Sequence, residues 1–252
     1  MTPGLEFFDV FDTGSAALPA ESMYKLSDYA GRLLVMRPDS TMPIARLTAT
    51  RLQNAPLPVR LYYAQDVFRL NSGNGRNDQE FQAGVELIGA PDGRADLEVL
   101  ALAAQALRRC GAAEFKLELG HVQVFRSLVR ALTADEEQQD AIRHLIESKN
   151  YAALSDVLDS FGPSDAADAI RRLPRLFGGE EVLAAAAPLC RTEETRRALD
   201  ELNDLYQKLQ ALGLNGQVMI DLGLLHSHEY YTGMVFRGYL EGSGDTVISG
   251  GR

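Results

Sequence analysis

Three consecutive pieces of sequence dictate the architecture of this protein: VFRLN at Val67–Asn71, SGNGRND at Ser72–Asp78 and QEFQAGVELIG at Gln79–Gly89. An apolar run leads into Arg69, a glycine-rich loop turns the chain back, and a second run follows. This order is typical of a strand, a loop and a returning strand.

The returning strand is expected to carry a polar surface. Because side chains alternate between the two faces of a strand, Gln82, Gly84 and Glu86 share one face. Gly84 leaves space there for a group to lie against the backbone. We therefore predict a polar floor with the Arg69 guanidinium at its edge, which suits a small zwitterion or a phosphate.

Further blocks accompany this hairpin: MRPDSTMPIAR at Met36–Arg46, EYYTGMVF at Glu229–Phe236 and SGGR at Ser249–Arg252. Together with the hairpin they resemble motif 2 and the amino-acid-binding blocks of class II aminoacyl-tRNA synthetases. The form is that of histidyl-tRNA synthetase and of its paralogues, the regulatory subunits of ATP phosphoribosyltransferase. The blocks stand in the family's order and cover most of the chain. The resemblance implies an α+β fold, with a mixed, mainly antiparallel sheet flanked by helices and an all-helical insertion.

The composition limits the partners of the chain. Its 252 residues and 46% hydrophobic content suit a globular core. The net charge of −10 repels a polyanion, so we expect no tRNA partner. Cys110 and Cys190 lie far apart in helical contexts, and we interpret them as buried free thiols in a reducing compartment. No apolar run approaches the ~20 residues of a membrane span, and no signal peptide opens the chain. We expect a soluble, cytoplasmic protein with no membrane partner.

The spacing of the hydrophobic residues and the positions of the turn residues predict the secondary-structure elements. Strands are expected at 60–68, 115–119, 218–222, 234–239 and 246–249, with a hairpin over 26–36 that turns at 28–31. Helices are expected at 43–52, 92–110, 135–146, 151–158, 164–176, 180–189 and 193–212. We expect Thr41 to cap the first helix, Gly111 to end the second, and turns at 178–179 and 242–244. Residues 1–121 and 214–252 are expected to form two parts of the synthetase-like core, and 122–213 the helical insertion.

Seven residues are candidates for a histidine-like ligand pocket: Asp39, Thr41, Arg69, Gln82, Glu86, Tyr230 and Tyr231. Arg69 offers a planar fork of donors to a carboxylate or phosphate, or else forms a structural ion pair with Asp39 or Glu86. Gln82 and Glu86 either bind an amino group or an imidazole N–H, or serve as sheet-surface hydrogen-bonding groups. Thr41 either lines the pocket or only caps the helix. The resemblance places Asp39 where the family's glutamate contacts the ammonium of the amino acid.

Two positions depart from the synthetase pattern that the resemblance implies. Asn71 stands where motif 2 has the glutamate that reads adenine, and His226 replaces an arginine that acts at the reacting centre. A fixed guanidinium stabilises developing charge, which a mostly neutral imidazole does not do. We therefore expect no adenylation, no catalytic residue and no cofactor. His226 and His228 share a strand face, but no third ligand stands at a diagnostic spacing, so pocket lining or surface placement is favoured over a metal site.

The resemblance implies a non-catalytic regulatory subunit of ATP phosphoribosyltransferase. Such a subunit assembles with the short catalytic subunit, activates it, and allows feedback inhibition by histidine in the first step of histidine biosynthesis. Two alternatives stay open: a histidine–tRNA ligase or a fragment of one, and a free-standing amino-acid-binding paralogue. The family's dimer-building motif 1 would precede Met1, and its motif 3 arginine would follow Arg252. We therefore expect a homo-oligomer in the full-length protein and weaker dimerisation of this stretch alone.

Overall fold

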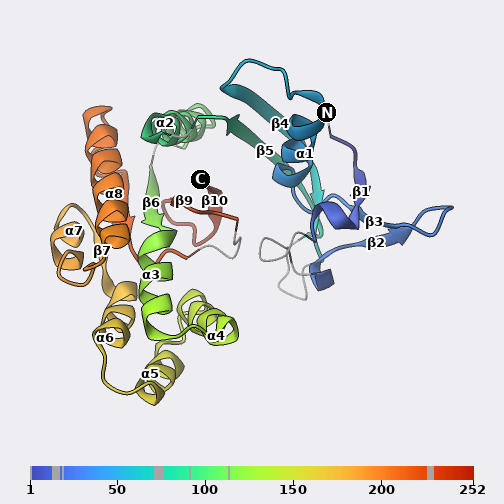
Figure 1. The fold of residues 1–252 in the computed structure, drawn as a ribbon. Coiled ribbons are helices and arrows are strands. Elements are labelled where there is room, and N and C mark those ends of the chain that lie inside the picture. Colours follow the sequence, from blue (N-terminus) through green and yellow to red (C-terminus); the bar gives the residue numbers. More distant parts are fainter. Residues whose placement is uncertain are drawn as a thin grey trace. The chain divides into compact units, whose positions relative to one another are not determined.

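The computed structural model describes residues 2–12, 18, 20–70, 77–90, 92–112, 114–225 and 230–252 (Figure 1). Contacts within the chain divide it into two compact units, and each is described by itself. Unit 1 comprises Met1–Pro91 with His228–Tyr230, and unit 2 comprises Asp92–Ser227 with Tyr231–Arg252.

Unit 1 contains a small sheet, one α-helix and a long hairpin. The sheet has the antiparallel order β1-β3-β2 and consists of β1 (Leu5–Phe7), β2 (Lys25–Ser27) and β3 (Leu33–Met36). The remaining elements are the short 3₁₀ turns η1 (Phe8–Val10) and η3 (Ala20–Ser22), helix α1 (Thr41–Arg51) and the hairpin strands β4 (Val59–Phe68) and β5 (Gln79–Ile88). The predicted β2–β3 hairpin, the first helix and the strand with its return are confirmed.

The β2–β3 turn falls where the sequence predicts it. The Asp28 carboxylate accepts hydrogen bonds from the amides of Ala30 and Arg32, at 2.8 and 2.9 Å. Gly31 has a φ of 76°, in the left-handed region that glycine adopts at little cost. An aspartate whose side chain holds its own following residues is a common way to close a turn.

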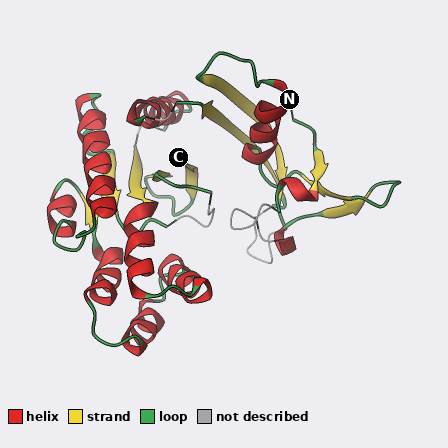
Figure 2. Ribbon diagram, viewed as in Figure 1, coloured by secondary structure: helices red, strands yellow, loops and turns green. Residues whose placement is uncertain are grey.

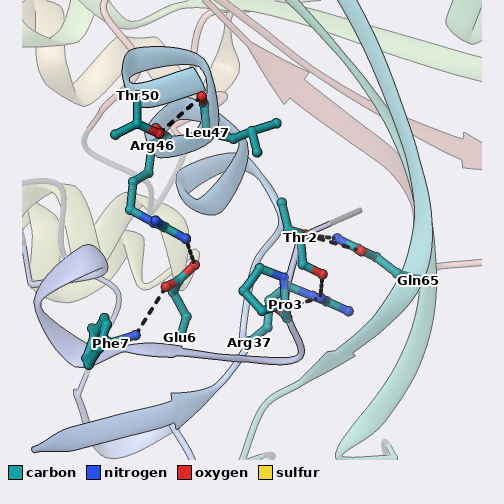
Figure 3. A network of polar contacts seen from close by, with 9 residues as sticks. All are labelled: Thr2, Pro3, Glu6, Phe7, Arg37, Arg46, Leu47, Thr50 and Gln65. Atoms are coloured by element: carbon teal, nitrogen blue, oxygen red, sulfur yellow. Dashed lines mark hydrogen bonds and ion pairs between the residues drawn. The ribbon is translucent and has the colours of Figure 1, made fainter. Parts of the chain in front are cut away.

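A buried arginine ties the N-terminal segment to the hairpin. Arg37 is 5% exposed, and its Nη1 donates to the carbonyls of Thr2 and Pro3 at 3.1 and 2.7 Å. Its Nε and Nη2 both donate to the carbonyl of Asp66 in β4, at 3.2 and 2.6 Å. Figure 3 shows the guanidinium beside Thr2 and Pro3, with the Gln65 side chain reaching Thr2 from β4. Because a buried charge must satisfy its donors, the arginine of the MRPDST block has a structural role.

Unit 2 is organised around a five-stranded sheet with the order β10-β9-β6-β8-β7. Its strands are β6 (Phe115–His121), β7 (Phe177–Gly178), β8 (Val218–Asp221), β9 (Met234–Leu240) and β10 (Thr246–Gly251). Strands β6 and β8 run parallel, and all other neighbours are antiparallel. The expectation of a mixed, mainly antiparallel sheet is confirmed.

Helices make up most of the rest of unit 2 (Figure 2). They are α2 (Gly93–Arg109), α3 (Val122–Leu132), α4 (Glu136–Glu147), α5 (Tyr151–Ser160), α6 (Asp165–Arg172), the 3₁₀ turn η4 (Leu173–Arg175), α7 (Glu181–Ala186) and α8 (Glu193–Ala211). Helix α8 packs on α2, α3, β6 and β8, and buries leucines of both sheet and helix, among them Leu117, Leu119, Leu202 and Leu209. Within the described ranges, no helix has the length and apolar character needed to cross a membrane.

Two elements of unit 2 differ from the predictions. Helix α3 lies in the stretch expected to be helical but is not among the individual helices predicted, because it follows β6 at once, without a usual capping residue. His121 caps it instead, with Nδ1 accepting from the Gln123 amide at 3.3 Å. Strand β7 interrupts the stretch expected to be wholly helical. Gly178, expected in a turn, pairs with Ile220 of β8. A strand of two residues is too short to show any alternation of side chains.

The cysteines are free thiols, as predicted, but only one is buried. Cys190 lies in the core of unit 2, where burial raises the pKa of its thiol to about 11. Cys110 is exposed, so the prediction of a second buried thiol is wrong. Cys110 occupies the C-cap of α2, where the helix ends and the apolar stripe no longer faces the core.

Candidate ligand-binding site

The N-terminal end of α1 brings together Asp39, two residues before the helix, and Thr41, its first residue. The Asp39 carboxylate accepts from the amides of Thr41 and Met42, at 2.7 and 3.4 Å, at the helix end that favours negative charge. Ser40 is the N-cap position and makes no side-chain capping bond. The prediction that Thr41 caps this helix is therefore wrong, because Asp39 already holds the first-turn amides. The Thr41 hydroxyl instead donates to Glu86 Oε1 at 2.8 Å.

Strand β5 provides the predicted polar floor. Gln82, Gly84 and Glu86 are half-buried, whereas the alternating residues Phe81, Ala83 and Val85 are exposed. The shared face of the three residues is confirmed by this alternation. On β4, their partners across the hairpin are Gln65, Tyr63 and Leu61, respectively.

Glu86 is the titratable group of the floor. Its burial raises the pKa of the carboxyl to about 7, and the negative charge of Asp39 acts in the same direction. The hydrogen bond from Thr41 opposes this rise. Near neutral pH the carboxyl is thus divided between an acceptor-only anion and a protonated form that can donate. Two neighbouring acids, one of them capping a helix, make this part of unit 1 suited to a cationic or N–H-donating ligand.

The space beside Gly84 is filled by a side chain that the sequence pattern does not single out. A Cβ on Gly84 would overlap the Tyr63 ring, which therefore lies directly against the glycine backbone. The Tyr63 hydroxyl donates to Gln82 Oε1 at 3.2 Å. The glycine does leave room against the backbone, as predicted, but the chain's own tyrosine occupies it.

Arg69 lies at the edge of the same site. Its Nε donates to the carbonyl of Pro38 at 2.7 Å, and its Nη2 lies 3.9 Å from Asp39 Oδ2. The side chain is 34% exposed, so the ion pair is loose and partly screened by water. Of the two structural ion pairs considered for Arg69, the structure shows the one with Asp39. The guanidinium remains positioned next to the acids of the site.

The two tyrosines of the pocket prediction lie in different units. Tyr230 groups with unit 1 and is half-buried. Tyr231 belongs to unit 2 and is 9% exposed, with its ring packed on Gly251. The structure thus groups Asp39, Thr41, Arg69, Gln82 and Glu86 within unit 1, together with the unpredicted Tyr63.

Three residues that bear on chemistry lie outside the described residues: Asn71, His226 and His228. Elsewhere in the described chain, no group of three or more histidine, cysteine, aspartate or glutamate side chains is arranged to hold a metal ion.

The motif 2 hairpin, the antiparallel sheets and the long helical stretch define a class II aminoacyl-tRNA synthetase-like fold. The family model described as histidyl-tRNA synthetase matches residues 1–252, and the chain belongs to that family.

Several relatives resemble the chain over its whole length. The ATP phosphoribosyltransferase regulatory subunit of Clostridium kluyveri is 39% identical over 255 residues, covering 100% of this chain and 65% of the relative. A solved ATP phosphoribosyltransferase regulatory subunit/histidyl-tRNA synthetase from Bacillus halodurans is 36% identical, with a TM-score of 0.90 over 100% of this chain and 66% of that one. This chain spans less than two thirds of the length of the curated relatives it matches, 65% and 61% for two of them.

One solved structure is a complex. A chain of the ATP phosphoribosyl transferase (HisG:HisZ) complex from Thermotoga maritima matches with 22% identity and a TM-score of 0.73, covering 100% of this chain and 84% of that one. At this identity the match shows a shared fold.

Proposed function

We propose that this chain acts in the regulatory subunit of ATP phosphoribosyltransferase, activating a short catalytic subunit and allowing feedback regulation by histidine in the first step of histidine biosynthesis. The observation that carries the proposal is the match of the whole of this chain to part of relatives that bear this name, at 39% identity for the relative from Clostridium kluyveri. The fold shared with the Thermotoga maritima complex supports a partnership with a catalytic subunit. We propose that the chain is a homo-oligomer in this assembly and that the assembly forms in the cytoplasm.

The polar floor supports histidine as the effector. Asp39 and Glu86 are two acids beside a helix N-terminus, and they match the ammonium and imidazole N–H groups of the amino acid. Arg69, next to Asp39, offers a donor fork for the carboxylate. Gln82 and Thr41 would complete the polar contacts, and Tyr230, which groups with the same unit, would supply a ring surface. The pocket therefore contains a counterpart for each polar group of histidine.

The sequence supports a non-catalytic role for the same pocket. Asn71 and His226 stand where a ligase of this family would carry glutamate and arginine. Without a fixed guanidinium at the reacting centre, the charge that develops during adenylation would be poorly stabilised. We therefore propose a binding site that has kept recognition and lost the activation of the amino acid.

Reconstitution tests this function directly. The chain is mixed with a short-form catalytic subunit, and phosphoribosyl transfer is measured with and without histidine. We expect the chain to raise the activity and histidine to lower it again. Histidine-dependent ATP–pyrophosphate exchange by the chain alone would identify a ligase and overturn the proposal.

A pair of variants distinguishes a loss of histidine binding from a loss of assembly with the catalytic subunit. Glu86→Gln should blunt inhibition by histidine while sparing the uninhibited activity, because binding and inhibition are linked reciprocally. Glu80→Gln is the matched control, since Glu80 is an exposed glutamate of the same strand. Equal inhibition of both variants would mean that histidine binds elsewhere.

A further inference from the structure

Thr41 joins the two carboxyl groups of the candidate site through separate donors. Its backbone amide donates to Asp39 Oδ1 at 2.7 Å, and its hydroxyl donates to Glu86 Oε1 at 2.8 Å. All three residues belong to unit 1. One residue at the start of α1 therefore holds both acids, although Asp39 precedes the helix and Glu86 lies on strand β5.

The two carboxyl groups receive unequal support for a negative charge. Asp39 accepts from the amides of Thr41 and Met42, and the Arg69 guanidinium lies 3.9 Å from its Oδ2. Among the hydrogen bonds of the described residues, Glu86 accepts only the one from the Thr41 hydroxyl. Hydrogen-bond donors and a nearby cation favour the ionised form of an acid. Of two acids that share a site, Glu86 is therefore the one that takes up a proton.

The neighbours of Glu86 on strand β4 do not offset its charge. Its partner across the hairpin is the apolar Leu61, and the hydroxyl of Tyr63, on the same face, donates to Gln82. Burial raises the pKa of Glu86 to about 7, the hydrogen bond from Thr41 opposes the rise, and the charge of Asp39 adds to it. The burial and the contacts thus assign the proton to the same residue.

We propose that an N–H group of the ligand replaces the proton on Glu86, so that binding releases this proton to solvent and strengthens as the pH rises. The inference rests on the proposed function, in which histidine is the ligand. A protonated carboxyl donates from the oxygen that carries its proton, whereas an ionised one only accepts. The ligand N–H thus needs the ionised form of Glu86. The effector site responds to pH as well as to the concentration of histidine.

Carbon-13 NMR tests the shared site without any ligand. The side-chain carboxyl resonances are titrated with pH, and Glu86→Gln assigns the resonance of Glu86. We expect its midpoint near pH 7 and a lower midpoint in Asp39→Asn. Asparagine removes the neighbouring charge but keeps an acceptor for the Thr41 amide. Glu80→Gln, on the exposed face of the same strand, should leave the midpoint in place. Equal midpoints in Asp39→Asn and the unmodified chain overturn the proposal.

Calorimetric titration with histidine tests the release itself. The heat is measured in buffers with different enthalpies of ionisation, because a released proton is taken up by the buffer. At pH 7 we expect the unmodified chain to release about 0.5 proton more per histidine than Glu86→Gln. At pH 8 the difference should fall to about 0.1 proton. Equal release from both proteins, or uptake of protons by the unmodified chain, would show that Glu86 keeps its proton and would overturn the proposal.

The affinity for histidine gives an independent measure of the same linkage. Relative to Glu86→Gln, the affinity of the unmodified chain should rise about tenfold from pH 6 to pH 8. The ratio cancels the titration of histidine, which both proteins share. Binding with a constant ratio would refute the proton release and leave the proposed function standing. If the unmodified chain binds no histidine, the proposed function fails, whereas the carboxyl titrations still decide which acid holds the proton.

Discussion

Replacing Glu86 by glutamine should make the free energy of unfolding less dependent on pH. Burial raises the pKa of this carboxyl from 4.5 to about 7, so between these values the native state binds more protons than the unfolded chain. The stability that the protonated carboxyl contributes is fully present below pH 4.5 and is lost as the pH rises through about 7. Each pKa unit corresponds to about 1.4 kcal/mol, so the ionised carboxylate costs the native state about 3 kcal/mol at pH 8.

Glutamine keeps the shape of the side chain and an acceptor for the Thr41 hydroxyl, but it carries no charge at any pH. At pH 5 we therefore expect Glu86→Gln and the unmodified chain to have similar unfolding free energies. At pH 8 the variant should be more stable by about 3 kcal/mol. Urea unfolding followed by far-UV circular dichroism, repeated from pH 5 to 8.5, measures both curves, with Glu80→Gln as the exposed control. Parallel curves for Glu86→Gln and the unmodified chain would refute the assignment of a raised pKa to this site.

Three further substitutions probe the same unit. Thr41→Val should raise the pKa of Glu86 further, because it removes the hydrogen bond that stabilises the carboxylate; a ¹³C NMR titration of the glutamate carboxyls measures it. Gly84→Ala should destabilise the chain by about 1–3 kcal/mol by overpacking against Tyr63, and urea unfolding should show this cost disappearing in a Tyr63→Ala background. Arg37→Met should cost on the order of 3 kcal/mol, since it leaves three backbone carbonyls without their buried donor; an unfolding midpoint equal to that of the unmodified chain would contradict the structural role of Arg37.

The parts of the site that follow from local geometry could be predicted from the sequence. The common face of Gln82, Gly84 and Glu86 depends only on the period of a strand, which is the same in every sheet. The hairpin turn at Asp28 depends on a side chain that reaches its own neighbours. In both cases the determining contacts lie within a few residues of each other, so a reading of the local pattern is sufficient.

The parts that depend on distant contacts could not be predicted in this way. Asp39 and Thr41 are both common capping residues. Asp39 holds the first-turn amides, and the Thr41 hydroxyl binds Glu86, which lies far along the chain. Tyr63 lies on Gly84 because of the register between β4 and β5, which no single strand reveals. Strand β7 exists only through its pairing with β8. Tertiary contacts select among local options that the sequence leaves equal.

The Tyr63 ring lies on Gly84 and so occupies a part of the polar floor that a ligand could otherwise contact. Any ligand that needs that patch of backbone must first displace the Tyr63 ring and break its hydrogen bond to Gln82. Only the molecules in which the ring has turned away can accept such a ligand, and the apparent affinity falls in proportion to that fraction. A ligand small enough to bind Asp39 and Glu86 beside the ring avoids this loss. In the proposed site, the Tyr63 ring would therefore favour ligands small enough to leave it in place.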